Sequence, residues 1–89
     1  MKAVKIPIDG VLDLHTFDPK ELSHLLCDYL AACRAKGICE IRVIHGKGTG
    51  AQRARVRNLL EMNSIVKGYR DAPPEQGGWG ATLVTLVAG

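Results

Sequence analysis

The chain is organised around the stretch Val43-Ile44-His45-Gly46-Lys47-Gly48-Thr49-Gly50, whose pattern predicts an apolar strand that runs into a glycine-rich turn. A basic helix is expected directly after it. The turn would therefore sit at a helix N-terminus, where backbone N–H groups and the helix dipole attract anions. The three glycines let the main chain approach a guest closely, and Lys47 adds a positive charge. The stretch predicts a phosphate-binding turn.

The residues before this stretch predict a strand, a helix and a second strand. Residues 11–15 alternate apolar and polar side chains, as a half-buried strand does. Asp18 is a typical N-cap, Pro19 suits the first helical position, and Gly37 marks the end of the helix. Residues 38–44 should then run parallel to the first strand, because a helix connects the two. The apolar stripe of this helix comprises Leu22, Leu25, Leu26, Tyr29, Leu30 and Cys33.

The residues after the stretch predict a second helix and two more strands. Thr49 and Gln52 form a candidate capping box for the helix, which should end near Asn63. Residues 65–70 have the composition of a strand, and residues 81–87 are apolar enough on both faces to lie inside the sheet. The loop between these two strands is rich in glycine and proline, so we expect it to be exposed and irregular.

These elements give the order βαβαββ and a single α/β domain. Right-handed crossovers place both helices on the same face of a four-stranded mixed sheet, so we expect a two-layer α/β sandwich with strand order 1-2-4-3. Residues 11–89 make up this domain. Residues 1–10 are expected to form an N-terminal extension or an extra edge strand, since Pro7 is tolerated only at the edge of a sheet.

Composition indicates a small globular domain and excludes several classes of protein. The 89 residues are 46% hydrophobic, which favours a folded core over disorder. No apolar run approaches the length of a membrane span, so we expect a cytoplasmic protein with no membrane partner. The net charge is only +3, so the placement of the arginines, and not the total, indicates a polyanionic partner. The cysteines lack a C-x-x-C spacing and are expected to be reduced packing residues, not zinc ligands: Cys27, Cys33 and Cys39.

Two histidines mark the predicted catalytic centre. The tripeptides Asp13-Leu14-His15 and Val43-Ile44-His45 close the two parallel strands, so both histidines should emerge at the sheet edge where α/β proteins bind ligands. Two imidazoles with a carboxylate can perform general acid–base catalysis, which makes Asp13, His15 and His45 the candidate catalytic residues. The alternatives are that each histidine only makes structural hydrogen bonds and that Asp13 only orients His15 or caps a turn.

On RNA, this set of residues predicts a reaction that needs no metal or other cofactor. One histidine would take the proton of the 2′-OH while the other protonates the leaving oxygen, with Asp13 fixing a tautomer. A single nearby carboxylate is too few for a two-metal nuclease. The alternative is a single divalent metal ion held by Asp13 and the two histidines.

Basic and aromatic side chains extend the predicted phosphate site. Arg53 and Arg57 lie four residues apart on one side of the second helix, where two like charges are unfavourable unless an anion binds between them. The alternative is a solvated helix face. Trp79, among glycines, is either a lid packed on the sheet edge or a platform on which nucleobases stack. The candidate nucleic-acid-binding residues are Gly46, Lys47, Gly48, Thr49, Gly50, Arg53, Arg57 and Trp79.

Three ordered motifs span most of the chain, namely Leu12-Asp13-Leu14-His15, His45-Gly46-Lys47-Gly48 and Gly77-Gly78-Trp79-Gly80-Ala81-Thr82. Together they resemble the Smr (small MutS-related) domain family over residues 11–87. The resemblance implies a fold like the C-terminal domain of a translation initiation factor. Members of the family include DNA-nicking endonuclease domains of MutS paralogues and RNA endonucleases that cut messenger RNA at stalled ribosomes. The family motifs fall on Asp13, on His15 and on residues 45–48, while Thr16 stands where many members have glycine.

We therefore predict a stand-alone Smr-like domain that binds nucleic acid, with structure-selective endonuclease activity on DNA or RNA as the leading function. The alternative is a binding module with the same fold and no turnover, and a third class is a protein-interaction adaptor. The sequence has no MutS-type ATPase or clamp region, so any targeting to mismatches or to the ribosome is expected to come from a partner protein or from nothing at all.

Overall fold

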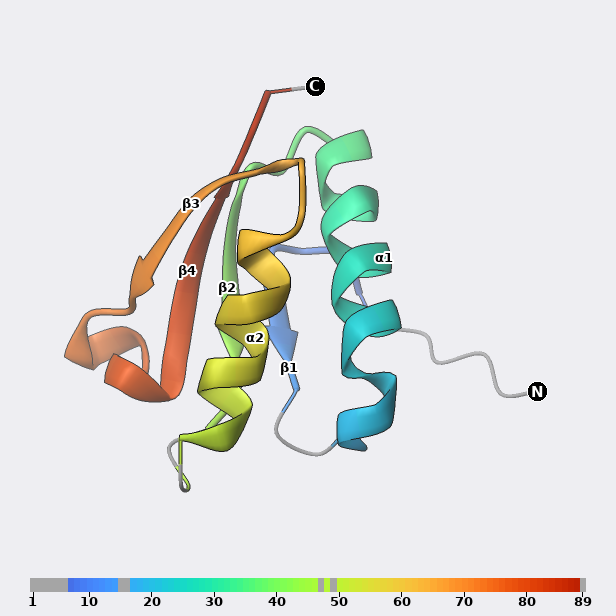
Figure 1. The fold of residues 1–89 in the computed structure, drawn as a ribbon. Coiled ribbons are helices and arrows are strands. Elements are labelled where there is room, and N and C mark those ends of the chain that lie inside the picture. Colours follow the sequence, from blue (N-terminus) through green and yellow to red (C-terminus); the bar gives the residue numbers. More distant parts are fainter. Residues whose placement is uncertain (1–6, 15–16, 47, 49, 89) are drawn as a thin grey trace.

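The protein consists of a mixed sheet covered on one face by helices (Figure 1). It is represented by a computed structural model that describes residues 7–14, 17–46, 48 and 50–88. The strands in this part of the chain are β1 (Val11–Asp13), β2 (Glu40–Ile44), β3 (Val66–Asp71) and β4 (Ala81–Leu86). They lie in the order β1-β2-β4-β3, with β1 parallel to β2 and the other neighbouring pairs antiparallel.

Two α-helices of the described chain, α1 (Leu22–Ala35) and α2 (Ala51–Glu61), lie on the same face of this sheet (Figure 1). The parallel β1–α1–β2 unit accounts for the arrangement, because right-handed crossovers place consecutive helices on one side. The two-layer α/β sandwich and the strand order 1-2-4-3 predicted from the sequence are confirmed.

The register of the sheet brings several strand ends to one edge. Asp13 at the end of β1 lies opposite Ile44 at the end of β2, and Ile44 lies opposite Ala81 at the start of β4. Asp71, the last residue of β3, lies opposite Thr82 on β4. We call this end of the sheet, marked by these residues, the site edge; the N-terminus of α2 lies at the same end of the molecule (Figure 1).

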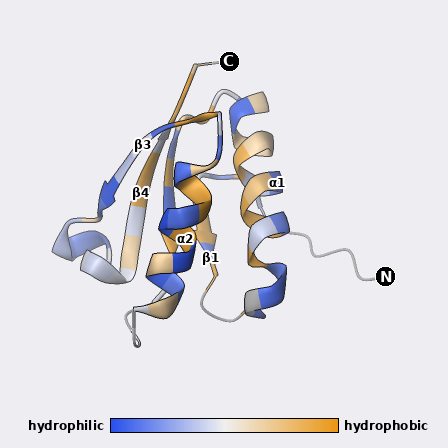
Figure 2. Cartoon of the chain, in the orientation of Figure 1, coloured by the Kyte–Doolittle hydropathy of each residue, from blue (hydrophilic) through white to orange (hydrophobic). Residues whose placement is uncertain are grey.

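An apolar core fills the space between the helices and the sheet, and hydrophobic residues line the side of α1 that faces it (Figure 2). In α1 the stripe predicted from the sequence is buried, apart from Leu25, which is half-buried. From α2, only Val56 and Leu60 are buried. Burying one such apolar side chain contributes about 2 kcal/mol, so α1 is the main anchor of the helical layer. The strands contribute Leu12, Ile41, Val43, Val84 and Leu86.

The start of α1 differs from the sequence prediction. Residues Pro19–Glu21 form a 3-10 turn, η1, and the α-helix begins only at Leu22. Asp18 caps this turn instead of the α-helix, because its carboxylate accepts a hydrogen bond from the Lys20 backbone N–H at 2.9 Å. The predicted end of the helix is confirmed, since Gly37 has a φ of +81°, a left-handed angle that favours glycine.

The predicted capping box of α2 is wrong. The N-cap is Gly50, whose φ is +86°, and no side chain among the described residues makes a capping hydrogen bond there. A residue with a Cβ is strained at this angle, so this position favours glycine. The N-cap is therefore Gly50 and not the predicted Thr49. The first intrahelical bond confirms the boundary, because the Ala54 N–H donates to the Gly50 carbonyl at 3.0 Å.

Two connecting segments also differ from expectation. The loop over residues 71–80 is not fully irregular, because Pro74–Gln76 and Gly78–Gly80 form the 3-10 turns η2 and η3. The predicted N-terminal edge strand is not observed at residues 7–8, which belong to no strand. The residues before them lie outside the described part of the chain.

Candidate nucleic-acid interface

The glycine-rich turn connects β2 to α2 at the site edge. Gly46, Gly48 and Gly50 have φ angles of +83°, +31° and +86°. Because a Cβ is strained at such angles, the backbone of this turn requires glycine, as the sequence predicted. No atom of the described residues lies within 4 Å of a Cβ built on Gly48, so the space in front of it is open to a guest. Lys47 and Thr49 lie outside the described residues.

His45 is buried against β4 at the base of this turn, with an exposed fraction of 2%. Its Nε2 lies 2.8 Å from the Thr82 hydroxyl oxygen, and its Nδ1 lies 3.1 Å from the Gly46 carbonyl oxygen. A carbonyl can only accept, so we assign the proton to Nδ1, and in the neutral ring Nε2 then accepts from the Thr82 hydroxyl. Both ring nitrogens therefore hold the turn onto β4.

The surroundings of His45 favour the neutral ring. Burial lowers the pKa of His45 below 6.5, and the positive charges of Arg53 and Arg57 lower it further. The hydrogen bond to Gly46 and the charge of Asp71 act in the opposite direction, but the net shift is downward. The lowered pKa therefore favours the uncharged ring at neutral pH, in agreement with the tautomer assigned above.

Asp13 and His45 close neighbouring strands but leave the sheet on opposite faces. Asp13 is exposed between Leu12 and Leu14, which are both fully buried, and side chains alternate along a strand. His45 instead continues the buried, helix-facing series of β2. The alternation thus separates two side chains that the sequence analysis placed together. His15 lies outside the described residues, and the catalytic assignment of these three residues stays a prediction.

Two arginines of α2 meet one carboxylate of β3. The Arg53 Nη2 donates to Asp71 Oδ1 at 2.7 Å, and the Arg57 Nη2 donates to the same oxygen. The carboxylate relieves the repulsion between two like charges one helical turn apart. The hydrogen bond from Arg53, reinforced by both positive charges, holds the pKa of Asp71 below its usual range. The anion expected between the arginines is therefore supplied, in this structure, by the chain itself.

Each of these arginines also faces an aromatic ring. The Arg53 guanidinium carbon lies 6.0 Å from the Trp79 ring centroid, and that of Arg57 lies 5.1 Å from the Tyr69 ring centroid. The Tyr69 hydroxyl donates to Glu61 Oε1 at 2.6 Å, which fixes the second ring. A cation over an aromatic face is stabilised by about 0.5–1 kcal/mol at partly exposed sites. The rings thus give each guanidinium group a second contact besides the carboxylate.

The arginine pair has hydrogen-bonding capacity that the described chain does not use. The Nε atoms of Arg53 and Arg57 are buried and have no hydrogen-bond partner among the described residues. A guanidinium presents a planar fork of several N–H donors, a geometry that fits the oxygens of a phosphate. The Asp71 side chain is 48% exposed, so an incoming anion can reach the pair. The arrangement can therefore bind a phosphate beside the carboxylate or in its place.

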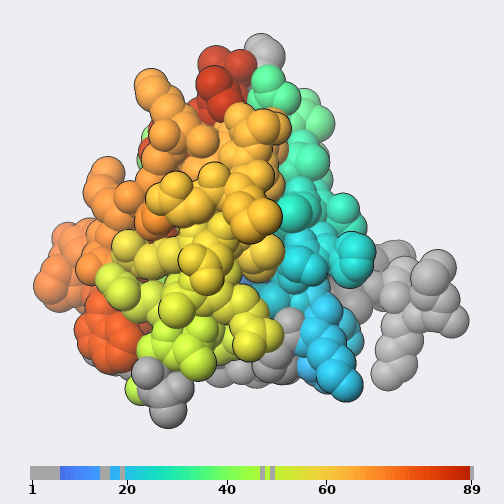
Figure 3. All heavy atoms as spheres, viewed as in Figure 1, coloured from blue at the N-terminus to red at the C-terminus, as the bar shows by residue number. Residues whose placement is uncertain are grey.

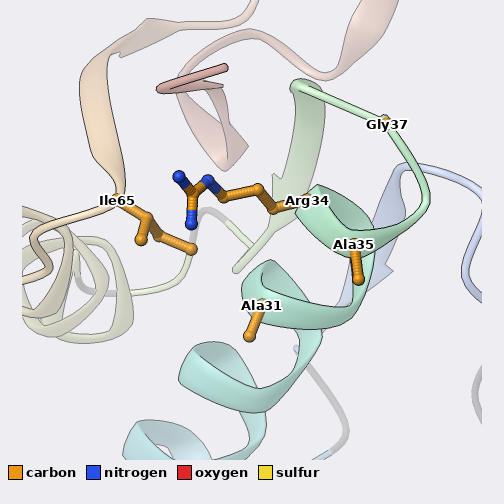
Figure 4. A pocket seen from close by; sticks show the side chains of 5 residues that line it. All are labelled: Ala31, Arg34, Ala35, Gly37 and Ile65. Atoms are coloured by element: carbon orange, nitrogen blue, oxygen red, sulfur yellow. The ribbon is translucent and has the colours of Figure 1, made fainter. Parts of the chain in front are cut away.

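Other features of the described residues lie away from the site edge. A hollow of about 510 Å³ lies between the last turn of α1 and the residue before β3, where Figure 4 shows the Arg34 side chain reaching toward Ile65. The Arg34 Nε donates to the Val87 carbonyl at 3.1 Å, which gives this residue a structural role at the opposite end of the sheet. In the described part of the chain, no three His, Cys, Asp or Glu side chains gather as a metal-binding group. No helix there is long and apolar enough to cross a membrane.

Three residues of this interface were not predicted from the sequence: Asp71, Tyr69 and Thr82. Asp71 lies 18 positions from Arg53, and Thr82 lies 37 positions from His45, so only the tertiary fold brings these pairs together. A signal for Thr82 was present, because a polar residue within an apolar strand needs a buried partner. Asp71 follows directly on an arginine at the end of a predicted strand, and nothing in that local pattern identifies its partners.

Comparison with known proteins places the chain in a family. The Smr domain family model matches residues 12–87. This chain belongs to the Smr domain family. Its fold matches the crystal structure of the Smr domain of Thermus thermophilus MutS2 with a TM-score of 0.83 and 37% identity, covering 89% of this chain and 99% of that one. It also matches YdaL, a stand-alone small MutS-related protein from Escherichia coli, with a TM-score of 0.81 and 28% identity over 86% of this chain and 63% of that one.

Two relatives that are similar to this chain in sequence carry the name endonuclease MutS2. The endonuclease MutS2 of Clostridium kluyveri is 39% identical to this Smr domain over 75 residues, which cover 84% of this chain and 10% of that protein. The endonuclease MutS2 of Thermus thermophilus is 46% identical over 57 residues, which cover 64% of this chain and 8% of that protein. The chain thus spans about a tenth of the length of these relatives. The family resemblance predicted from the three sequence motifs is confirmed.

Proposed function

We propose that this Smr domain binds the phosphate backbone of DNA or RNA at the site edge and cleaves it as an endonuclease. The observation that carries the proposal is the contact of Arg53 and Arg57 with one carboxylate oxygen of Asp71. An anionic oxygen already occupies the point where the two guanidinium groups meet, and a phosphate oxygen has the same charge and accepts the same hydrogen bonds. The relatives named endonuclease MutS2 support the same class of function.

The glycine-rich turn supplies the second part of the proposed phosphate site. Its glycine backbone leaves open space at Gly48, and the dipole of α2 favours an anion at the end where the turn lies. Lys47 would add a positive charge, and Trp79 would flank the bound strand. The proposed binding residues are Gly46, Lys47, Gly48, Thr49, Gly50, Arg53, Arg57 and Trp79.

For the chemical step we assign the reacting groups to Asp13 and His15. On RNA, His15 would accept the proton of the 2′-OH as that oxygen attacks phosphorus, with Asp13 fixing the tautomer. The bond from phosphorus to the 5′ oxygen would break, and the leaving oxygen would take a proton from solvent. The glycine-rich turn would stabilise the additional negative charge on the phosphate. We give His45 a positioning role, since both of its nitrogens are engaged.

A second candidate function is a nucleic-acid-binding module without turnover. The observation that favours it is the engagement of both ring nitrogens of His45, which leaves one fewer acid–base group than the sequence predicts. The identity of Thr16 also favours this candidate, because this residue follows His15 at a position where many family members have glycine. The predicted alternative to metal-free chemistry is a divalent ion, and such an ion would have to be coordinated without His45.

Incubation of the protein with labelled nicked, branched, duplex and single-stranded DNA and RNA tests the proposal, with binding and cleavage scored together. We expect at least one substrate to be bound and cut in the presence of EDTA, leaving cyclic or 3′-phosphate ends on RNA. Cleavage that requires added Mg²⁺ or Mn²⁺, or that is equal on a 2′-deoxy substrate, would contradict the metal-free step. Binding without products would favour the module, and no binding to any substrate would overturn the whole proposal.

Three histidine variants separate the proposed roles. His15→Ala should abolish cleavage and leave binding within about twofold, because it removes a reacting group only. His45→Gln should weaken binding and cleavage together, because it loosens the turn that holds the phosphate. His24→Ala, at an exposed position of α1, is the control and should behave as the wild type. Equal effects of His15→Ala and His24→Ala on cleavage would remove His15 from the mechanism.

Partners beyond nucleic acid are proposed from the sequence analysis alone. The candidate partners predicted there, a targeting protein or the ribosome, are retained as proposals. RNA binding and a cytoplasmic location are retained as predictions on the same footing. Co-sedimentation of the tagged protein with ribosomes at low and high salt tests the first of these.

A further inference from the structure

The structure places a tryptophan at the surface beside the arginine pair. Trp79 is the only tryptophan of the chain, lies in η3, and is 44% exposed. It does not belong to the hydrophobic core of the described residues. Gly77 and Gly78 precede it with φ angles of +114° and +59°, which only glycine adopts without strain. The local backbone is therefore built to present this ring at the surface.

The turn that carries Trp79 is fixed to the proposed phosphate site. The Gly80 carbonyl accepts hydrogen bonds from the backbone N–H groups of His45 at 3.1 Å and of Gly46 at 2.9 Å. A Cβ built on Gly50 would lie 4.0 Å from the indole carbon Cζ3, so the ring stands next to the start of α2. In Figure 3 the deep-orange segment that contains η3 borders the yellow-green first turn of α2 at the surface. The indole and the phosphate site thus share one surface.

We propose that Trp79 is a stacking subsite for one unpaired nucleobase, next to the phosphate that Arg53 binds. The proposal rests on the proposed function and names the part of the nucleic acid that this site reads. The guanidinium carbon of Arg53 lies 6.0 Å from the ring centroid, a separation that a single nucleotide can span between its phosphate and its base. Stacking of a base on an aromatic side chain is sequence-tolerant, because every base has a flat π-face.

Pairing state decides which bases can use this subsite. A base inside a duplex is stacked on its neighbours and cannot reach a protein ring without being extruded. A base in a single strand, a gap or a flap is free to stack. The subsite therefore favours unpaired nucleotides over intact duplex by about tenfold, the affinity that one stacked base contributes.

The single tryptophan makes the subsite directly observable. We excite the indole selectively and titrate the wild type with a single-stranded oligonucleotide and with a blunt duplex of the same sequence, while anisotropy of a labelled strand reports binding. We expect the single strand to quench the fluorescence in step with binding, because the base stacks on the ring. The duplex should bind with little quenching. Equal quenching by both ligands, or binding of the single strand with unchanged emission, would overturn the proposal.

Three variants test the role of the ring in affinity. Trp79→Ala should weaken single-strand binding by about tenfold and duplex binding by less than about twofold, whereas Trp79→Phe should retain most of the affinity because it keeps an aromatic face. Met62→Ala, which truncates an 85% exposed side chain, is the matched control. If Trp79→Ala instead lowers the unfolding temperature and weakens the binding of both ligands equally, the ring is a packed lid, and the proposal of a stacking subsite is wrong.

The outcomes separate this inference from the proposed function. An oligonucleotide that carries one abasic nucleotide, moved stepwise along the strand, should lose affinity for the wild type at one position and lose nothing further for Trp79→Ala. If no position of the abasic nucleotide weakens strand binding, the proposed stacking subsite is wrong, and the proposed phosphate binding still stands. Failure of the wild type to bind any strand or duplex would overturn both.

Discussion

The two helices cover the same face of the sheet but make different kinds of contact with it. α1 buries leucines, a tyrosine and a cysteine along its whole length, whereas α2 buries only Val56 and Leu60. In place of further apolar contacts, α2 directs Arg53 and Arg57 to the end of β3, where they meet Asp71. One helix therefore anchors the fold, and the other carries charge at the site edge.

The difference between the two helices shows where this fold contains energetically unfavourable contacts. Two buried Nε atoms without a partner among the described residues, and a pair of like charges, are unfavourable features that α1 does not contain. Departures from efficient packing of this kind concentrate at functional sites. The contrast predicts that substitutions in α1 change stability, while substitutions of charged residues on α2 and β3 change ligand binding.

The largest expected effect is on stability, from truncation in α1. Leu30 is fully buried, so Leu30→Ala should lower the free energy of unfolding by about 3 kcal/mol through lost apolar contact and a residual cavity. Urea denaturation followed by circular dichroism measures this. The matched substitution Arg57→Ala in α2 should lower it by less than about 1 kcal/mol, because the ion pair is partly exposed. Equal losses in the two helices would break the comparison.

A smaller effect is expected from Asp71→Asn, which should increase the affinity for nucleic acid. The substitution removes the negative charge that competes with a phosphate, while the rings of Tyr69 and Trp79 keep both guanidinium groups in place. We expect affinity for a nucleic-acid strand to rise about fivefold at low salt, as one exposed charge interaction would give. Asp28→Asn, the same substitution at an exposed position of α1, is the control and should raise affinity less. A loss of affinity in Asp71→Asn would mean that the carboxylate orients the arginines for the ligand.

Asp71 also gives the ion pair a defined pH dependence. Hydrogen bonding to Arg53 depresses the pKa of Asp71 below 3.8, so the contribution of the pair to stability is present above that pH and is lost as the pH falls through the lower, folded-state value. Wild type and Asp71→Asn should therefore differ in stability at neutral pH and converge in strong acid. Because the pair is exposed, the difference should be small.

The smallest expected effect concerns the buried histidine. Burial lowers the pKa of His45 below 6.5, so the unfolded chain binds a proton at this residue more readily than the folded protein does. The contribution of His45 to stability is complete above 6.5 and declines as the pH falls toward its folded-state pKa. His45→Gln should remove this component of the pH dependence when unfolding is followed from about pH 7 to about pH 5. An unchanged slope in the variant would show that the ring titrates normally.

The sequence predicted the fold because its signals are local and mutually consistent. The stripe of α1, the parallel pairing of β1 with β2 and the buried strand Ala81–Leu86 all follow from periodicity and chain order. The N-cap of α2 was missed because Thr49 fits a capping box, whereas the turn reaches the helix through a left-handed Gly50.

The site was less predictable because its contacts connect distant parts of the sequence. The glycine requirement of the turn and the shared side of Arg53 and Arg57 could be predicted from spacing alone. The partner of those arginines could not, because Asp71 reaches them only through the pairing of β3 with β4. The sequence also did not predict that Asp13 and His45 lie on opposite faces of the sheet. The end of a strand fixes a residue's position along the sheet, but not the face on which its side chain lies.

The central claim, that the arginine pair binds phosphate, is tested most directly by the salt dependence of binding for Arg57→Ala and Arg55→Ala. Both substitutions remove one positive charge from α2, but Arg55 is exposed and makes neither the contact with Asp71 nor the contact with an aromatic ring that Arg57 makes. We expect Arg57→Ala to weaken binding of every sequence alike and to reduce the slope of log affinity against log salt by about one, and Arg55→Ala to leave the slope nearly unchanged. Identical slopes for the two variants would contradict the account.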